Sequence, residues 1–305
     1  MTTSTALRPS VRAALHGLID YAGLFPPAQL SLDAAQREYR EARGGPYAWM
    51  LGRFILAARR LEESPGDFGE PLSAIVDPDV DALHRLADAK RGGAAVEALE
   101  IPLMESVSPF REHLSRDDVL DALGALESDL VVAGLRDLAA FAEIPRGGAW
   151  WRSLDETMSA AARFRLGAKL RCGGLTAGAF PSVEEVAAFV GAAARAEVPF
   201  KATAGLHHPV RHRDAATGFV MHGFLNLLAA AALAARVDAE TLERVVGEED
   251  PRAFAFDQET FAWRDQRVSV AELQRVRREG FIAYGSCSFS EPVEDLTALG
   301  VLPAQ

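Results

Sequence analysis

The sequence predicts a (β/α)8 barrel of the TIM-like kind. Three observations support this prediction: short apolar segments alternate with helical segments, about eight such units follow one another, and 305 residues suffice for eight of them. The expected strands are residues 16–24, 53–57, 72–77, 96–102, 139–145, 168–172, 200–204 and 281–287. Because the strands alternate with helices, the sheet should be parallel, and an open doubly wound sheet is the alternative.

Helical segments fit between most of these strands. They are residues 31–42, 79–91, 117–138, 154–165, 183–196 and 217–236. Pro181, Ser182 and Glu184 stand where the fifth of these helices should begin, and Ser31 opens the first in the same way. Residues 62–70, after the second strand, are too few and too rich in Gly and Pro to form a full helix.

An insertion separates the last long helix from the eighth strand. It spans residues 238–266, and its apolar runs 253–256 and 260–263 predict a small hairpin, with a helix at 269–279 following it. The sequence has no linker and no low-complexity run. We therefore expect one barrel domain over residues 1–305.

Residues 215–235 contain no charged side chain, and about 20 apolar residues is the usual length of a membrane span. Thr217, His222 and Asn226 interrupt this stretch, and its second half is mostly alanine. We therefore expect no membrane segment but a buried helix at 217–236, either at the barrel wall or at an interface that could form a homo-oligomer.

The composition limits the kinds of partner that the protein is expected to bind. The formal net charge of −11 argues against a nucleic-acid partner and an anionic membrane surface, since both are bound mainly by clustered Lys and Arg. Cys172 and Cys287 are the two cysteines, and we expect free thiols in a cytoplasmic protein without a signal peptide.

Lysine is rare in this chain and is placed unusually. Only three of the 32 basic residues are lysine. Lys90 lies at the end of a surface helix, whereas Lys169 and Lys201 lie in two apolar strands. Side chains alternate across a strand, so Lys169 and Arg171 should point into the barrel, as should Lys201 and Thr203. Unlike arginine, a desolvated lysine can lose its proton and act as a nucleophile or base.

Carboxylates are expected beside these lysines. The fourth and fifth strands both end in Glu-Ile-Pro, with Glu100 and Glu143 at the carboxyl-end rim where barrel active sites are built, and Asp20 on the first strand also faces inward. Two lysines and Arg171 should lower one another's pKa, so that one lysine becomes a neutral amine able to form a Schiff base. Charged lysines would instead act as acids or bind an enolate or carboxylate. A purely stabilising ion network is the structural alternative.

Other candidate groups follow the sixth, seventh and eighth strands. His207 and His208 could transfer protons, or could be loop residues bonded to the backbone, while His212 should face solvent and His222 should pack on a helix. Cys172 should point away from the barrel, and Cys287 is a possible nucleophile. Backbone N–H groups of four residues could bind phosphate or carboxylate together with Arg171, or could simply form turns. These four are Gly173, Gly174, Gly285 and Ser286.

Lysines on adjacent sixth and seventh strands resemble the site of class I aldolases of the deoxyribose-phosphate aldolase type. This resemblance implies that Lys169 forms the Schiff base and that Lys201 lowers its pKa, although Leu-Arg-Cys-Gly-Gly follows Lys169 where that family has Thr and Ser. Segments 20–27, 201–209 and 285–292 also resemble an uncharacterised bacterial family of barrel proteins, which implies no activity.

The resulting hypothesis is a cytoplasmic lyase or isomerase that acts on a small anionic carbonyl compound, phosphorylated or carboxylated, without a cofactor. Lys169 or Lys201 supplies the amine, Glu143 and His207 move protons, and Arg171 binds the anion. One alternative is a metal-dependent hydrolase or decarboxylase, with Mg²⁺, Mn²⁺ or Zn²⁺ held by side chains of this rim. Those ligands would be Asp20, Glu100, Glu143, His207 and His208. Another alternative is a catalytically inactive barrel that binds a ligand or partner.

Overall fold

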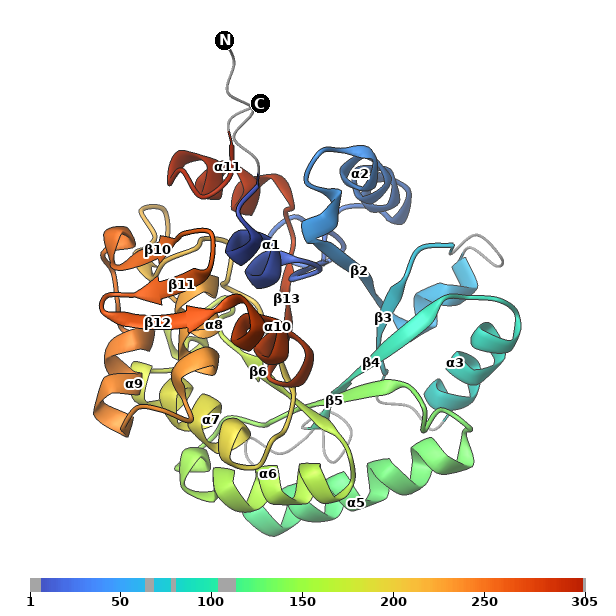
Figure 1. Cartoon of the computed structure of the whole chain (residues 1–305). Helices are drawn as coiled ribbons and strands as arrows, with labels where there is room; N and C mark the ends of the chain where they lie inside the picture. Colours follow the sequence, from blue (N-terminus) through green and yellow to red (C-terminus); the bar gives the residue numbers. More distant parts are fainter. Residues whose placement is uncertain (1–6, 64–68, 78–80, 104–113, 304–305) are drawn as a thin grey trace.

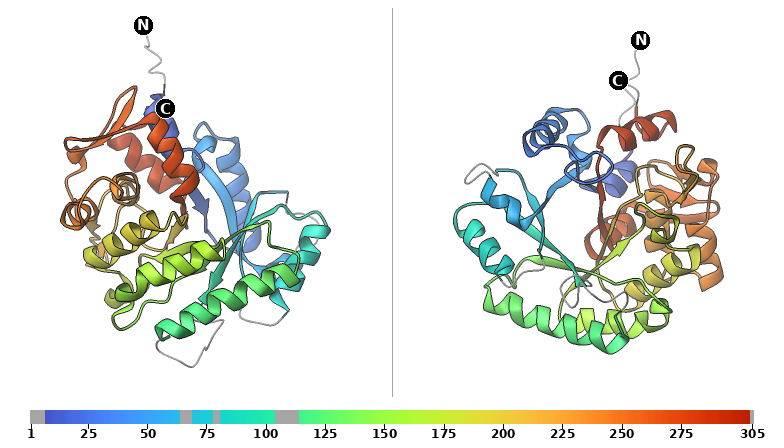
Figure 2. Two further views of the ribbon diagram at one scale, coloured as in Figure 1. Left: turned by 60° about the horizontal axis from the view of Figure 1, so that its bottom comes forward. Right: turned by 180° about the vertical axis from the view of Figure 1, so that it is seen from behind.

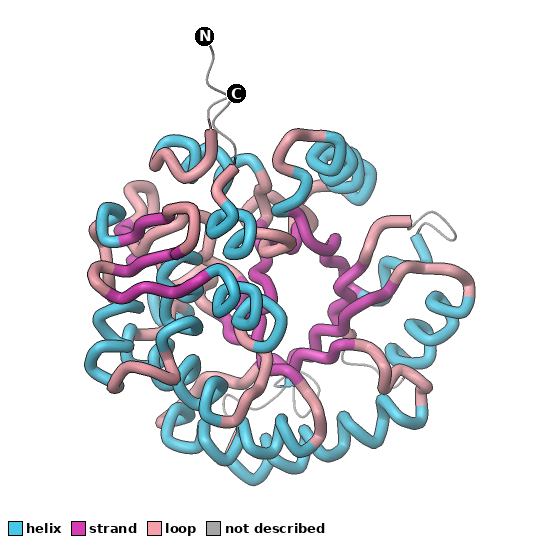
Figure 3. Tube along the Cα trace, in the orientation of Figure 1, coloured by secondary structure: helices cyan, strands magenta, loops and turns pink. Residues whose placement is uncertain are grey.

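A closed barrel of eight parallel strands forms the centre of the computed structural model, which describes residues 7–63, 69–77, 81–103 and 114–303. The strand order around the barrel is β1-β13-β7-β6-β5-β4-β3-β2, and helices surround it (Figure 1, Figure 3). The predicted (β/α)8 barrel is therefore confirmed, and the open sheet is excluded.

All eight predicted strands are present, several of them shorter than expected. They are β1 Ile19–Tyr21, β2 Leu51–Ala57, β3 Leu72–Ile75, β4 Val96–Pro102, β5 Ala139–Glu143, β6 Gly167–Arg171, β7 Phe200–Thr203 and β13 Phe281–Ser286. β6 and β7 pair in register with Lys169 opposite Lys201, and β5 places Glu143 opposite Lys169. Residues far apart in the sequence are thus brought to one level of the barrel.

Helices cover the outside of the barrel. They are α1 Pro9–Leu15, α2 Leu32–Gly44, α3 Ala82–Arg91, α5 Arg116–Val132, α6 Leu154–Arg163, α7 Val183–Arg195, α8 Phe224–Leu233, α9 Ala239–Val246, α10 Val270–Glu279 and α11 Ser290–Ala298. Short 3-10 turns occupy Ala48–Met50, Ala58–Glu63, Trp150–Ser153, Ala177–Ala179 and Pro251–Ala253. Three of the helices, α1, α9 and α11, were not predicted. After β2 the chain forms the turn Ala58–Glu63, so the expected lack of a full helix is confirmed up to residue 63.

The charge-free stretch divides into two structures, which corrects the prediction of one helix over residues 217–236. β8 (His212–Arg213) pairs with β9 (Val220–Met221) as a small hairpin, and α8 begins only at Phe224. A Cβ at Gly223 would lie 2.4 Å from the Pro209 carbonyl oxygen, so the chain is tightly packed where the helix starts.

Most of α8 is buried within the single chain, packed against α7, α9, α10 and β13. The helix therefore forms part of the barrel wall, and a homo-oligomer stays a prediction. In the described part of the chain, no helix is both long and apolar enough to cross a membrane.

The insertion forms an antiparallel sheet on the outside of the barrel (Figure 1, Figure 2). β10 (Phe254–Phe256) and β11 (Thr260–Trp263) make the predicted hairpin, and β12 (Gln266–Ser269) adds a third strand that was not predicted. The sheet contacts α1, α8 and α10, and α10 confirms the helix expected after the hairpin.

The interior of the barrel contains charged side chains, unlike the apolar layer between the strands and the helices. Phe141 fills the space beside Gly167, where a Cβ would lie 2.5 Å from the Phe141 ring. Glu143 is the next inward-facing residue along β5, and it lies at the level of Lys169. Phe141 thus fills part of the barrel interior, and the charged side chains of the interior form the candidate site.

Candidate functional site

Six charged side chains form a continuous chain across the barrel interior, with cations and anions alternating. Its order is Arg171, Glu143, Lys169, Glu100, Lys201 and Asp20. The Lys169 ammonium lies 2.6 Å from Glu100 and 3.1 Å from Glu143, and Lys201 lies 2.6 Å from Asp20 and contacts Glu100. The predicted inward direction of these residues is therefore correct, and three cations balance three anions. We call this arrangement the charge chain.

One end of the charge chain is sealed. The side chain of Asp20 is 0% exposed, and its Oδ1 atom accepts a hydrogen bond of 2.6 Å from the Arg53 backbone N–H. A Cβ at Gly52 would lie 2.2 Å from the same oxygen, so glycine is needed there. Lys201, 1% exposed, lies 5.7 Å from the centre of the Phe141 ring, which adds a cation–π contact.

The other end reaches the rim of the barrel. Arg171 is the last residue of β6, its side chain is 50% exposed, and its Nε donates to Glu143 over 2.8 Å. The Glu143 side chain is 14% exposed, against 4% for Lys169. Glu143 and Arg171 are therefore the members of the charge chain that a molecule arriving at the rim meets first.

Ser73 is a member of the site that the sequence analysis missed. Its buried hydroxyl donates to Glu100 over 2.7 Å and accepts from the Lys201 ammonium over 3.0 Å. Ser73 stands at an inward position of β3, so a hydroxyl residue in an otherwise apolar strand was the available signal. Both Glu100 oxygens are thereby occupied, because Glu100 also pairs with Lys169.

The pKa of Lys169 shifts in the direction opposite to the one that we expected. Burial alone would lower the pKa of Lys169, but attraction from Glu100 and Glu143 more than offsets it, so the pKa is raised. Burial opposes ionisation of Glu100 and Glu143 in the same way, yet the cations beside them hold both pKa values below the ordinary range. Glu100 lies between the two lysine side chains, so the pKa of Lys169 shifts opposite to the predicted direction, which favours its ammonium form.

The two rim histidines bind carboxylates of α11 and are not part of the charge chain. The Nδ1 atom of His207 lies 2.9 Å from Glu291, and that of His208 lies 2.5 Å from Asp295. Histidines oriented by a carboxylate can transfer protons, and His207 is the more enclosed of the two. His212 is only half-buried and stacks edge-on with His208. His222 is buried, as expected of a packed histidine.

Both cysteines are buried free thiols, as the composition predicts. Burial raises the pKa of Cys172 to about 12, and its sulfur lies outside the charge chain. The Cys287 sulfur is 3.7 Å from Nε2 of His207, but burial raises the pKa of this thiol too. A thiol that keeps its proton is a weak nucleophile, so the raised pKa does not favour Cys287 for that role.

The small residues near the ends of β6, β7 and β13 pack closely. A Cβ at Gly173 would lie 2.8 Å from the Phe180 ring, and one at Gly174 would lie 2.7 Å from Ala179. A Cβ at Gly285 would lie 3.3 Å from the Thr203 hydroxyl, and the buried Ser286 hydroxyl donates to the Ser288 carbonyl over 2.6 Å. Close packing accounts for glycine at these positions, and their use in binding an anion stays a prediction.

The carboxylates do not form a metal site with the histidines. A lysine ammonium lies between Asp20 and Glu100, and another lies between Glu100 and Glu143. Across residues 7–63, 69–77, 81–103 and 114–303, no group of three or more His, Cys, Asp or Glu side chains is placed to hold a metal ion. In this arrangement the lysine ammonium groups stand between the carboxylates that were proposed as ligands of a divalent metal.

Comparisons with known proteins do not assign this chain to a family. No protein-family model matches the chain, and no curated protein is significantly similar to it.

Proposed function

We propose that the protein is a barrel enzyme of the lyase or isomerase type that acts on a small anionic carbonyl compound at the Arg171 end of the charge chain. The fold is one that many enzymes share, with their active sites at this rim. The observation that carries the proposal is the position of Glu143, which bridges an exposed guanidinium and a buried ammonium.

The first step follows from the geometry of Arg171. A planar guanidinium binds carboxylate or phosphate through two parallel hydrogen bonds, so an anionic substrate competes with Glu143 for it. When Arg171 turns to the substrate, Glu143 loses one of its two cations and its pKa rises. Glu143 then becomes a stronger base at the moment when the substrate is in place.

The second step uses the ammonium of Lys169. Glu143 removes a proton from the carbon next to the carbonyl, and the electron pair moves to the carbonyl oxygen. The Lys169 ammonium stabilises the resulting enolate in a desolvated position where charge interactions are strong. Return of the proton to another atom gives isomerisation, whereas loss of a group from the adjacent carbon gives a lyase reaction.

A covalent version follows from the resemblance to class I aldolases. It requires Lys169 to pass its proton to Glu143 before the amine attacks the carbonyl and releases water. Reduction with borohydride distinguishes the two versions, because it fixes a substrate adduct on Lys169 in the covalent one. Lys169→Arg keeps the charge but removes the amine, so it retains part of the activity only if Lys169 acts as an ion.

Exchange of substrate protons with D2O tests the proposal. The protein is incubated with a panel of small 2-oxo acids and phosphorylated ketoses, and ¹H NMR follows the loss of the C–H signal next to the carbonyl. Glu143→Gln should slow the exchange by about 10²-fold or more. Glu97→Gln changes an exposed glutamate on β4 that pairs with Arg53, and it should leave the rate unchanged. Absence of exchange across the panel, or equal rates in both variants, would overturn the proposal.

A further inference from the structure

A cavity lies beside the carboxyl-end rim, outside the charge chain. It has a volume of about 320 Å³ and lies between the loop after β6 and the segment that carries the β8–β9 hairpin. Phe180 and Pro181 line it from the first loop, and Arg211, Arg213, Phe219 and His222 line it from the second. The volume is at the lower end of the range of small-molecule sites, about 300–1,000 Å³.

Two aromatic rings, one from each of these segments, line the cavity and contact each other. The ring centres of Phe180 and Phe219 are 5.4 Å apart, with their planes inclined by 50°. A Cβ at Gly205 would lie 3.0 Å from the Phe180 ring, and the corresponding distance at Gly173 is 2.8 Å, so two glycines make room for this ring. A planar apolar group can pack on these two side chains without rearranging the strands.

Two arginines, Arg211 and Arg213, also line the cavity. Arg213 donates to the Gly218 carbonyl over 2.7 Å, and Arg211 pairs with Glu249. The Nε atom of Arg211 is buried and has no hydrogen-bond partner among the described residues. Among the described residues Arg213 has no carboxylate partner, whereas Arg211 is paired with Glu249, so Arg213 is the guanidinium that offers its charge to an anion in this cavity.

His222 adds an acceptor to the wall. Its Nε2 lies 2.8 Å from the Pro181 carbonyl oxygen, so Nε2 carries the proton and Nδ1 is left as an acceptor. This Nδ1 is buried and has no partner in the described part of the chain. Burial lowers the pKa of His222 to about 4, so the ring is neutral and does not add to the positive charge. A hydroxyl or N–H group would satisfy the acceptor.

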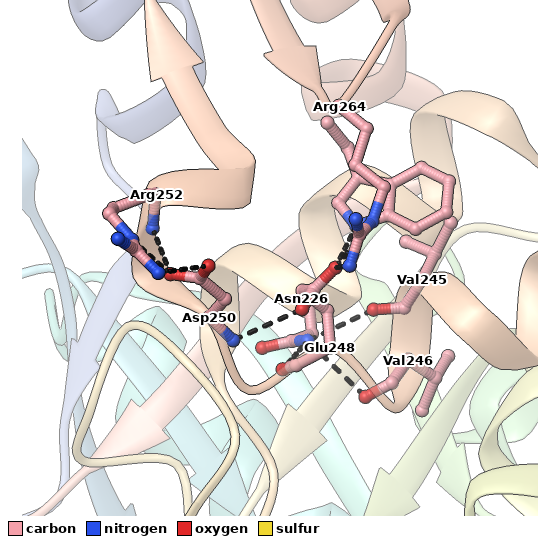
Figure 4. Close-up of polar contacts among 8 residues, drawn as sticks. Asn226, Val245, Val246, Glu248, Asp250, Arg252 and Arg264 are labelled. Carbon is pink, nitrogen blue, oxygen red and sulfur yellow. Dashed lines mark hydrogen bonds and ion pairs between the residues drawn. The ribbon is translucent and has the colours of Figure 1, made fainter.

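The segment that carries Arg211 is fixed from behind by Asn226. The Oδ1 atom of Asn226 accepts from the Arg211 backbone N–H over 2.9 Å. Its Nδ2 atom donates to the carbonyls of Val245 and Glu248 (Figure 4), and both hydrogen bonds are 2.9 Å long. A buried amide with this many partners rigidly connects the cavity wall to the end of α9, so the site is largely preformed.

We propose that this cavity is a second ligand site, separate from the charge chain, for a small organic anion with a planar apolar body. Arg211 and Arg213 bind its phosphate or carboxylate, Phe180 and Phe219 pack on its ring, and a donor group of the ligand reaches His222. The proposal does not depend on the reaction assigned to the barrel rim, because none of the six charge-chain residues lines this cavity.

Calorimetric titration with three probes tests it: phenyl phosphate, benzoate and inorganic phosphate. Phenyl phosphate or benzoate should bind with a 1:1 stoichiometry, at least about tenfold more tightly than inorganic phosphate, because the phosphate ion lacks the ring. Comparing the two ring-bearing probes shows whether the site prefers phosphate or carboxylate. Arg213→Gln should weaken binding about tenfold or more, and Phe219→Ala should remove the advantage of the ring.

Two control variants show whether the probes bind in this cavity or elsewhere on the protein. Arg252 lies outside the cavity and its side chain is 89% exposed, so Arg252→Gln should bind like the wild type. Arg171→Gln should also bind normally if the site is separate from the barrel rim. The proposal is overturned by absence of saturable binding of both ring-bearing probes, by binding that only Arg171→Gln abolishes, or by full affinity in both Arg213→Gln and Phe219→Ala. Phe219→Leu, which keeps an apolar side chain, replaces Phe219→Ala if the alanine variant does not fold.

Discussion

Removal of Lys201 is expected to destabilise the barrel strongly. Lys201→Met keeps the apolar stem of the side chain but leaves Asp20 without its cation and Glu100 with one lysine in place of two. Both carboxylates are at most 1% exposed, so water cannot compensate. Removing one partner of such a buried pair costs about 3–5 kcal/mol. For 305 residues, an unfolding entropy of about 2.1 cal/mol/K per residue converts this to about 5–8 °C in Tm.

Urea unfolding followed by circular dichroism measures this loss. Lys90→Met is the matched control, because Lys90 is an exposed lysine on α3, and it should change the unfolding free energy by less than about 0.5 kcal/mol. The double variant Lys201→Met with Asp20→Asn removes one charge of each sign. It should therefore lose about 0.5–3 kcal/mol less than the sum of the two single variants.

The loss should also depend on pH. The folded-state pKa of Glu100 is lowered in the wild type, so its stabilising contribution is present above the ordinary glutamate pKa of about 4.3 and disappears as the pH falls further. The difference between wild type and Lys201→Met should accordingly be larger at pH 7 than at pH 4. A cost below about 1 kcal/mol at pH 7, or a double variant that is no better than additive, would refute this account of the buried charges.

Three further predictions concern the scaffold. Gly223→Ala should cost about 1–3 kcal/mol because its Cβ would lie 2.4 Å from backbone atoms of Pro209 and Val210, whereas Gly178→Ala, with open space around it, should be nearly neutral in the same urea assay. Ser182→Ala should cost about 1 kcal/mol, because Ser182 and Glu185 form a reciprocal capping box at the start of α7, and a loss near zero would show that the cap contributes nothing. Alkylation of Cys287 by iodoacetamide should be slow in the folded protein at pH 7 and should accelerate as the pH rises towards the raised pKa, and rapid labelling at pH 7 would contradict this.

Most of the barrel could be predicted from the sequence because a parallel barrel leaves a simple pattern. Its strands are short apolar runs, and helices with clear start signals separate most of them. The prediction of one helix over residues 217–236 was wrong because a stretch without charged residues fits more than one kind of structure. Residues 212–223 form a hairpin and a tight turn, but the absence of charge in 215–235 suggested a continuous helix. The unpredicted helices are short: α1 precedes the first strand, α9 lies within the insertion, and α11 follows the last strand.

The members of the charge chain could also be predicted, but their order could not. Alternation along one strand shows which side chains face inward, and this was correct for Lys169, Lys201 and Glu143. The alternation does not show which side chain lies between two others. Lys201 and Glu100, for example, are 101 positions apart in sequence, and they meet only because of the register between separate strands. The position of Glu100 between the lysines reversed the expected direction of the Lys169 pKa shift.

The protonation state of Lys169 is the central claim, and NMR of the lysine side chains measures it most directly. The chain contains three lysines, so protein labelled with ¹³C and ¹⁵N in lysine gives three side-chain signals, which Lys90→Arg and Lys169→Arg assign. The account predicts that the Lys169 signal keeps the chemical shift of an ammonium ion from pH 6 to above the ordinary lysine pKa of about 10.4. A Lys169 signal that titrates between pH 6 and 8 would show a neutral amine at physiological pH and would contradict it.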